Sequence, residues 1–156
     1  MDSGNIGFVL LCAAFVFVMT PGLAMFYGGL VRKKNVVNTM MTSIFIIGVG
    51  IVMWVLFGYS LSFAPSGNAF IGDFRWLGLE GVSLTEGYTD DASIPNMVFS
   101  AFQMMFAVIT PALITGAVAG RMKFKSIFVF TIFWSLIVYY PLAHMAVSYT
   151  HLTLPT

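Results

Sequence analysis

Charged residues are scarce in this sequence. Asp, Glu, Lys and Arg together make up 8% of the 156 residues, whereas soluble domains carry about 25%. Four stretches contain none of them, at 6–31, 36–63, 94–119 and 126–147. A helix needs about 20 residues to cross a hydrocarbon core of about 30 Å. The sequence therefore predicts an all-α membrane protein with four transmembrane helices, which leave little of its length for a soluble domain.

Cysteine and histidine are also rare, and this limits the chemistry available. The single cysteine, Cys12, cannot form a disulfide within the sequence, and the two histidines are not spaced as metal ligands. No carboxylate lies inside the four stretches, and no phosphate-binding loop or nucleophile elbow is present. We expect no enzyme activity, cofactor or metal. The net charge of +1 gives no case for nucleic acid binding.

The few charges are sorted by sign. Six of the seven basic residues lie in the first and third gaps between the apolar stretches, whereas the acids lie at the N-terminus or in the second gap. Short basic loops stay in the cytoplasm. We therefore expect the N-terminus, loop 64–93 and the C-terminus outside, and loops 32–35 and 120–125 inside. Residues 1–7 contain an acid and no base, so the first stretch is read as a retained helix and not a signal peptide.

Two features outside the regular apolar pattern stand near the predicted outer surface. Loop 64–93 is rich in glycine and carries Trp76 and Tyr88, so it either packs on the outer mouth of the helix bundle or is a simple connector. His144 lies near the outer end of the fourth stretch. Because it is close to the interface, a structural hydrogen bond is the favoured role.

The third stretch has two distinct faces. Small and polar residues follow helical spacing along one side, which should face protein or a water-filled vestibule because polar groups are costly in lipid; they are Asn96, Ser100, Gln103, Ala107 and Thr110. Phe99, Phe102 and Phe106 lie on a neighbouring face. A ring face attracts a cation by about 0.5–2 kcal/mol, but phenylalanine is common here and ordinary packing is the alternative. Gly116 and Gly120, four apart, predict a close approach of two backbones.

Five successive strings carry a family resemblance. They are residues 21–37, 57–63, 101–107, 116–124 and 141–145. In order and spacing this set resembles the N-terminal portion of the ammonium transporter (Amt/Mep/Rh) family, about helices 1–4 of 11. The match covers residues 6 to 145.

The resemblance implies a multi-pass protein of the cell membrane that forms a homotrimer in the lipid bilayer, with ammonium and ammonia as substrates. It implies that ammonium is recruited at an outer aromatic vestibule, and that ammonia crosses a hydrophobic pore in the complete protein. By residue match, Phe102 falls on the vestibule wall and Phe106 on the gate. Phe26 and Tyr27 fall on the inner part of the pore path.

The resemblance ends near the C-terminus. Val147 stands where the family has a vestibule tryptophan, and the polar residues that follow do not continue a membrane pattern. We therefore divide the sequence into a partial transporter domain at 1–146 and a tail at 147–156 that does not resemble the family. Two alternatives stay open: a pore built from small four-helix subunits, and a non-transporting membrane module such as an ammonium sensor or scaffold fragment.

Overall fold

The protein is a bundle of long helices. The computed structural model describes residues 2–65, 68, 70–88 and 93–149, and within them it contains no strand beyond two isolated bridges, Asn68 with Ile71 and Gly87 with Pro95. Four helical spans in this part are long and apolar enough to cross a membrane. The predicted fold class is confirmed.

The first two spans are joined by a short basic connection. Helix α1 (Ser3–Leu30) is capped by Asp2, whose Oδ1 accepts the Gly4 N–H at 2.9 Å, and the helix continues through Pro21. A 3₁₀ turn, η1 (Lys33–Asn35), leads into α2 (Val36–Met53). A π-helical turn, η2 (Trp54–Gly58), then connects α2 to α3 (Tyr59–Phe63). These elements form one continuous span, Lys33–Phe63.

The third and fourth spans follow the long loop, which contains the 3₁₀ turn η3 (Leu77–Leu79). Helix α4 (Asn96–Val118) continues through Pro111. The fourth span consists of α5 (Phe124–Trp134), the π-helical turn η4 (Ser135–Tyr139), α6 (Tyr140–Ala143) and the π-helical turn η5 (His144–Tyr149). It begins two residues before the predicted stretch at 126, because Lys125 is included in its first turn. Basic residues are well placed at the end of a transmembrane helix.

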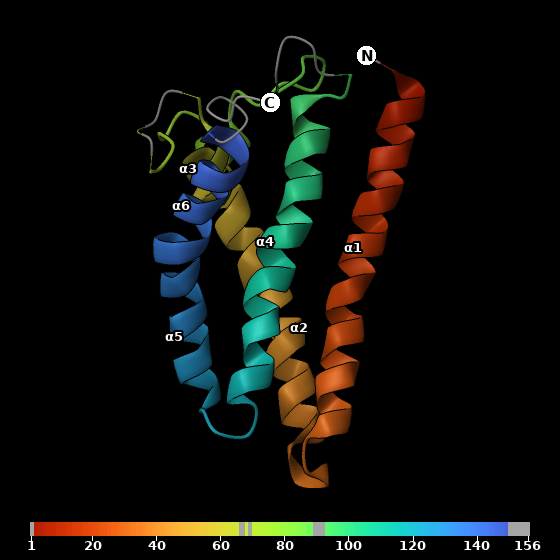
Figure 1. Ribbon diagram of the computed structural model, residues 1–156, viewed down its shortest axis with the longest axis vertical. Helices are drawn as coiled ribbons and strands as arrows, with labels where there is room; N and C mark the ends of the chain where they lie inside the picture. Colours follow the sequence, from red (N-terminus) through yellow and green to blue (C-terminus); the bar gives the residue numbers. More distant parts are fainter. Residues whose placement is uncertain (1, 66–67, 69, 89–92, 150–156) are drawn as a thin grey trace.

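The helices lie side by side, with α2 and α4 between α1 and α5 (Figure 1). We call the end of the bundle that carries Asp2 and the loop 64–93 the outer end, and the end that carries residues 31–35 and 119–123 the inner end. At the outer end the Asp2 N–H donates to the Ser93 carbonyl at 3.1 Å, and the Asn5 side chain donates to the Ser93 hydroxyl at 3.1 Å. The start of α1 is thereby fastened to the approach to α4.

Glycines create close contacts between the helices. A Cβ at Gly50 would lie 3.3 Å from Cα of Val108, so α2 and α4 approach closely at this point. The sequence predicted that Gly116 and Gly120 allow two backbones to approach closely, and this prediction is wrong. Gly116 makes room for the ring of Tyr27 from α1, and Gly120 has a φ of 70° in the connection after α4. An aromatic ring, and not a second backbone, uses the space at Gly116.

Candidate functional site

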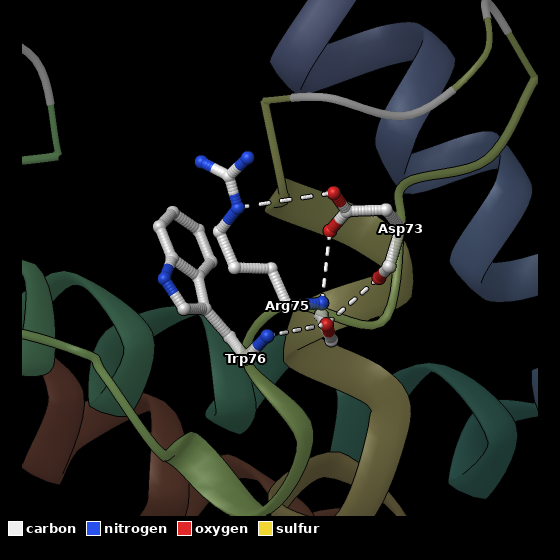
Figure 2. Close-up of polar contacts among 4 residues, drawn as sticks. Asp73, Arg75 and Trp76 are labelled. Carbon is white, nitrogen blue, oxygen red and sulfur yellow. Dashed lines mark hydrogen bonds and ion pairs between the residues drawn. The ribbon is translucent and has the colours of Figure 1, made fainter.

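Hydrogen bonds fasten the outer loop to the end of α3, and the hydroxyl group of Ser60 makes two of them. Ser60 Oγ donates to the Asp73 carbonyl at 2.8 Å and accepts the Trp76 N–H at 2.9 Å (Figure 2). Asp73 in turn accepts the Arg75 N–H at 2.9 Å, and its other carboxylate oxygen lies 3.9 Å from Arg75 Nε. The Gly72 N–H donates to the Leu61 carbonyl at 2.7 Å. These bonds hold residues 72–76 against the end of the second span.

The docked loop delivers two aromatic side chains to the bundle. Trp76 stacks on Tyr59 with ring centroids 5.4 Å apart, and Tyr88 stacks on Phe99 of α4 at 4.9 Å. The Tyr88 hydroxyl also donates to the Phe63 carbonyl at 3.2 Å. The expectation that this loop packs on the mouth of the bundle is confirmed, and the simple-connector alternative is wrong.

His144 joins the fourth span to the outer loop. Its side chain is buried, with Nδ1 3.0 Å from the Ser62 carbonyl and Nε2 3.0 Å from the Asn68 carbonyl. Both contacts are to backbone oxygens of the second span and the loop that follows it. The predicted structural role of this histidine is confirmed.

The polar stripe of α4 faces protein over much of its length. Asn96, Ser100 and Ala107 are buried. Asn96 Oδ1 accepts a hydrogen bond from the Tyr59 hydroxyl, and Ser100 Oγ accepts one from Trp54 Nε1 at 3.3 Å. Gln103 and Thr110 are only half-buried. The predicted orientation is therefore confirmed for the buried residues of the stripe, and Asn96 and Ser100 bond to side chains of α3 and η2.

The predicted vestibule and gate residues lie together on the adjacent face of α4. Phe102 and Phe106 are in edge-to-face contact, with ring centroids 5.2 Å apart and an interplanar angle of 80°. Phe102 is half-buried and Phe106 is 38% exposed. Phe99, in contrast, belongs to the packed aromatic cluster at the outer end. Phe106 is thus the most exposed of these three residues, and Phe99 is engaged by rings of the second span and the outer loop.

The two residues predicted on the inner pore path lie near the other end of the bundle and differ from each other. The Tyr27 hydroxyl donates to the Leu113 carbonyl of α4 at 3.0 Å, and its ring lies against Gly116. Phe26 is 61% exposed, with its ring centroid 5.7 Å from that of Tyr27. The structure does not bring these residues into contact with the pair on α4, which lies further toward the outer end.

Sequence reasoning missed the importance of Ser60, Trp54 and Gly72 for this site. Ser60 and Ser62 are the polar residues in an otherwise apolar helix end, and this interruption was a usable signal. Trp54 gave none, because it stands within an apolar run and nothing in its neighbouring sequence marks it as a hydrogen-bond donor. Its role depends on the position of Ser100, a residue 46 positions away in the chain.

Four long apolar helices with charges confined to two ends define a multi-pass integral membrane protein of the cell membrane. Comparison with known proteins gives the family, because the sequence matches the Ammonium Transporter Family over residues 7–153. The chain belongs to this family.

Individual relatives agree. The chain is 49% identical over 144 residues to an ammonium transporter of Bacillus subtilis. The matched region covers 92% of this chain and 35% of that protein. It is 43% identical to ammonium transporter 1 of Dictyostelium discoideum, over 92% of this chain and 31% of that protein. The crystal structure of Saccharomyces cerevisiae Mep2 matches it with a TM-score of 0.80 and 34% identity, over 92% of this chain and 34% of that one. The chain thus spans about a third of the length of the relatives it matches.

Proposed function

We propose that the protein carries ammonium nitrogen across the cell membrane and that this chain supplies part of the outer recruitment site. The proposal rests on the family and on one observation, the accessible aromatic pair Phe102 and Phe106 on α4. In this proposal Phe102 forms a wall of an outer vestibule, and Phe106 forms the gate below it. Phe26 and Tyr27 line the inner part of the path, and complete subunits assemble as a homotrimer in the bilayer.

The chemistry of the pair suits a small cation that must lose its water. A ring face attracts ammonium electrostatically, and the attraction grows as the cation is desolvated. A charge cannot continue into an apolar pore without a large cost, whereas neutral ammonia can. The edge-to-face arrangement leaves one ring free to contact the cation while the other blocks the path beneath it. Recruitment and gating would then be separate tasks of neighbouring residues.

The test uses a complete transporter, the Bacillus subtilis relative, in which residues 7–146 of this chain replace the matching segment. Phe102→Ala should weaken the apparent affinity for methylammonium by about threefold to thirtyfold, since one ring face of the cation site is lost. Phe106→Ala should change the maximal rate or admit an ion current with a smaller effect on affinity. Radiolabelled methylammonium uptake and membrane current measure the two effects.

Phe8→Ala is the matched control, because Phe8 is 68% exposed on α1 and belongs to no aromatic pair in the described part of the chain. It should leave uptake unchanged. Parental rate and affinity in both pair variants would reject the assigned roles of Phe102 and Phe106. An inactive but folded chimera would instead reject transport by this segment and favour a sensor or scaffold.

A further inference from the structure

The inner end of the bundle brings two basic connections together. Residues 31–35 join α1 to α2, residues 119–123 join α4 to α5, and both lie at the same end (Figure 1). The Asn35 N–H donates to the Arg32 carbonyl at 2.8 Å, and the Arg121 N–H donates to the Val118 carbonyl at 2.9 Å, so both connections are tight turns. The amide of the Asn35 side chain lies against Gly120, where a Cβ would be 2.9 Å away. The two turns are therefore in contact.

A cleft of about 410 Å³ lies between these turns. Its cationic lining comes from Arg32 and Lys34 of one turn and Arg121 of the other, together with Asn35. Val31 and Ala119, at the ends of α1 and α4, supply an apolar part of the wall. A single small site thus receives positive charge from two segments that are far apart in the sequence.

Within the described part of the chain, no acidic side chain neutralises the charge of this end. All six of its basic side chains belong to exposed residues; they are Arg32, Lys33, Lys34, Arg121, Lys123 and Lys125. The acids within the described residues lie in the N-terminal segment or the outer loop, and no ion pair is found for these six side chains there. Arg75, at the outer end, does have an acidic partner in Asp73. The cleft consequently favours a bound anion.

The position of the cleft indicates the kind of anion. Arginine binds phosphate oxygens through two parallel N–H groups, and Asn35 offers a further donor. The cleft lies where two membrane-spanning helices end, at the depth of the lipid headgroups. Basic pockets between transmembrane helices at this depth recognise anionic headgroups. We propose that this cleft binds the phosphate headgroup of an anionic phospholipid, with the acyl chains lying along the apolar ends of α1 and α4.

The proposal does not depend on ammonium transport, so it is tested by binding. The purified chain in neutral detergent is titrated with phosphatidylglycerol, and bound lipid is counted by native mass spectrometry. Arg32→Gln/Arg121→Gln should lower the affinity by at least about tenfold, since two cationic contacts are lost. Lys123→Gln/Lys125→Gln removes the same charge from the same end but outside the cleft, and should lower it by less than about threefold. Arg75→Gln should have no effect.

Three results would overturn the proposal. Equal weakening by the two double variants would mean that diffuse charge attracts the lipid. Equal affinity for phosphatidylcholine would mean that the anionic headgroup is not recognised. Full displacement by millimolar inorganic phosphate would mean that the cleft takes a soluble anion. If the melting temperature shows that Arg32→Gln/Arg121→Gln does not fold, the same comparison is made with Lys34→Gln against Lys33→Gln, because Lys34 lines the cleft and Lys33 does not.

Discussion

At the scale of single residues, the hydroxyl group of Ser60 makes two of the hydrogen bonds that hold the outer loop in place. The Ser60 hydroxyl donates once and accepts once, and both partners are backbone groups of the outer loop. Gly72 lies so close to this helix end that a Cβ would be 2.5 Å from the Ser60 carbonyl oxygen. A backbone atom cannot move aside as a flexible side chain can. The loop can therefore dock in this way only if residue 72 has no side chain.

Gly72→Ala should accordingly detach the loop from α3. Relieving the overlap would lengthen the Gly72 N–H to Leu61 bond and disturb the two bonds of Ser60, at a cost of about 1–3 kcal/mol. Limited proteolysis between residues 73 and 88 should become faster, and the melting temperature in detergent should fall. Gly22→Ala is the control, because nothing lies within 4 Å of a Cβ at that position. Unchanged proteolysis of the Gly72 variant would show that the loop is not held as described.

At the scale of elements, α4 illustrates what a sequence can and cannot reveal. The period of its polar residues predicted which side is buried, since a helix repeats every 3.6 residues and polar groups avoid lipid. The partners of those residues could not be predicted. Trp54 and Tyr59, which bond to Ser100 and Asn96, lie in η2 and directly after it, and helical turns of π type leave no clear mark in composition. The sequence likewise left open whether the outer loop packs on the bundle or is a simple connector. The contacts of Ser60 that hold the loop form only in the tertiary structure.

Packing of α1 on α4 should be sensitive to Gly116. Alanine there would overlap the Tyr27 ring, so the ring must shift and its bond to the Leu113 carbonyl should weaken. We expect Gly116→Ala to lower the free energy of unfolding by about 1–3 kcal/mol. Thermal unfolding in detergent measures this. Gly29→Ala, near the end of α1 with open space around its Cβ position, should be nearly neutral. Equal stability of the two variants would contradict the contact between Tyr27 and Gly116.

At the scale of the whole molecule, the structure places basic and acidic loops at opposite ends, but the side of the membrane that each end faces is still a prediction from charge. In a Cys12→Ser background, single cysteines at Thr85 and Ser126 should react with an impermeant maleimide from opposite sides of intact cells. Thr85 should be labelled from outside, and Ser126 only after permeabilisation. Both residues are exposed, so access to the side chain does not limit labelling. Labelling of both from outside would reject the topology.

The π-helical turn η2 has a consequence for how related chains can differ in length. A π-helical turn holds one residue more than the α-helical turn it replaces. Losing one residue from Trp54–Gly58 would restore a regular helix and rotate everything beyond it by about 100°. Ser60 would then point away from the loop, and Tyr59 away from Asn96, although none of these residues had changed. In this fold the number of residues in η2 thus sets the direction in which the side chains of α3 point. Deleting one residue there would change more contacts at the outer end than substituting one.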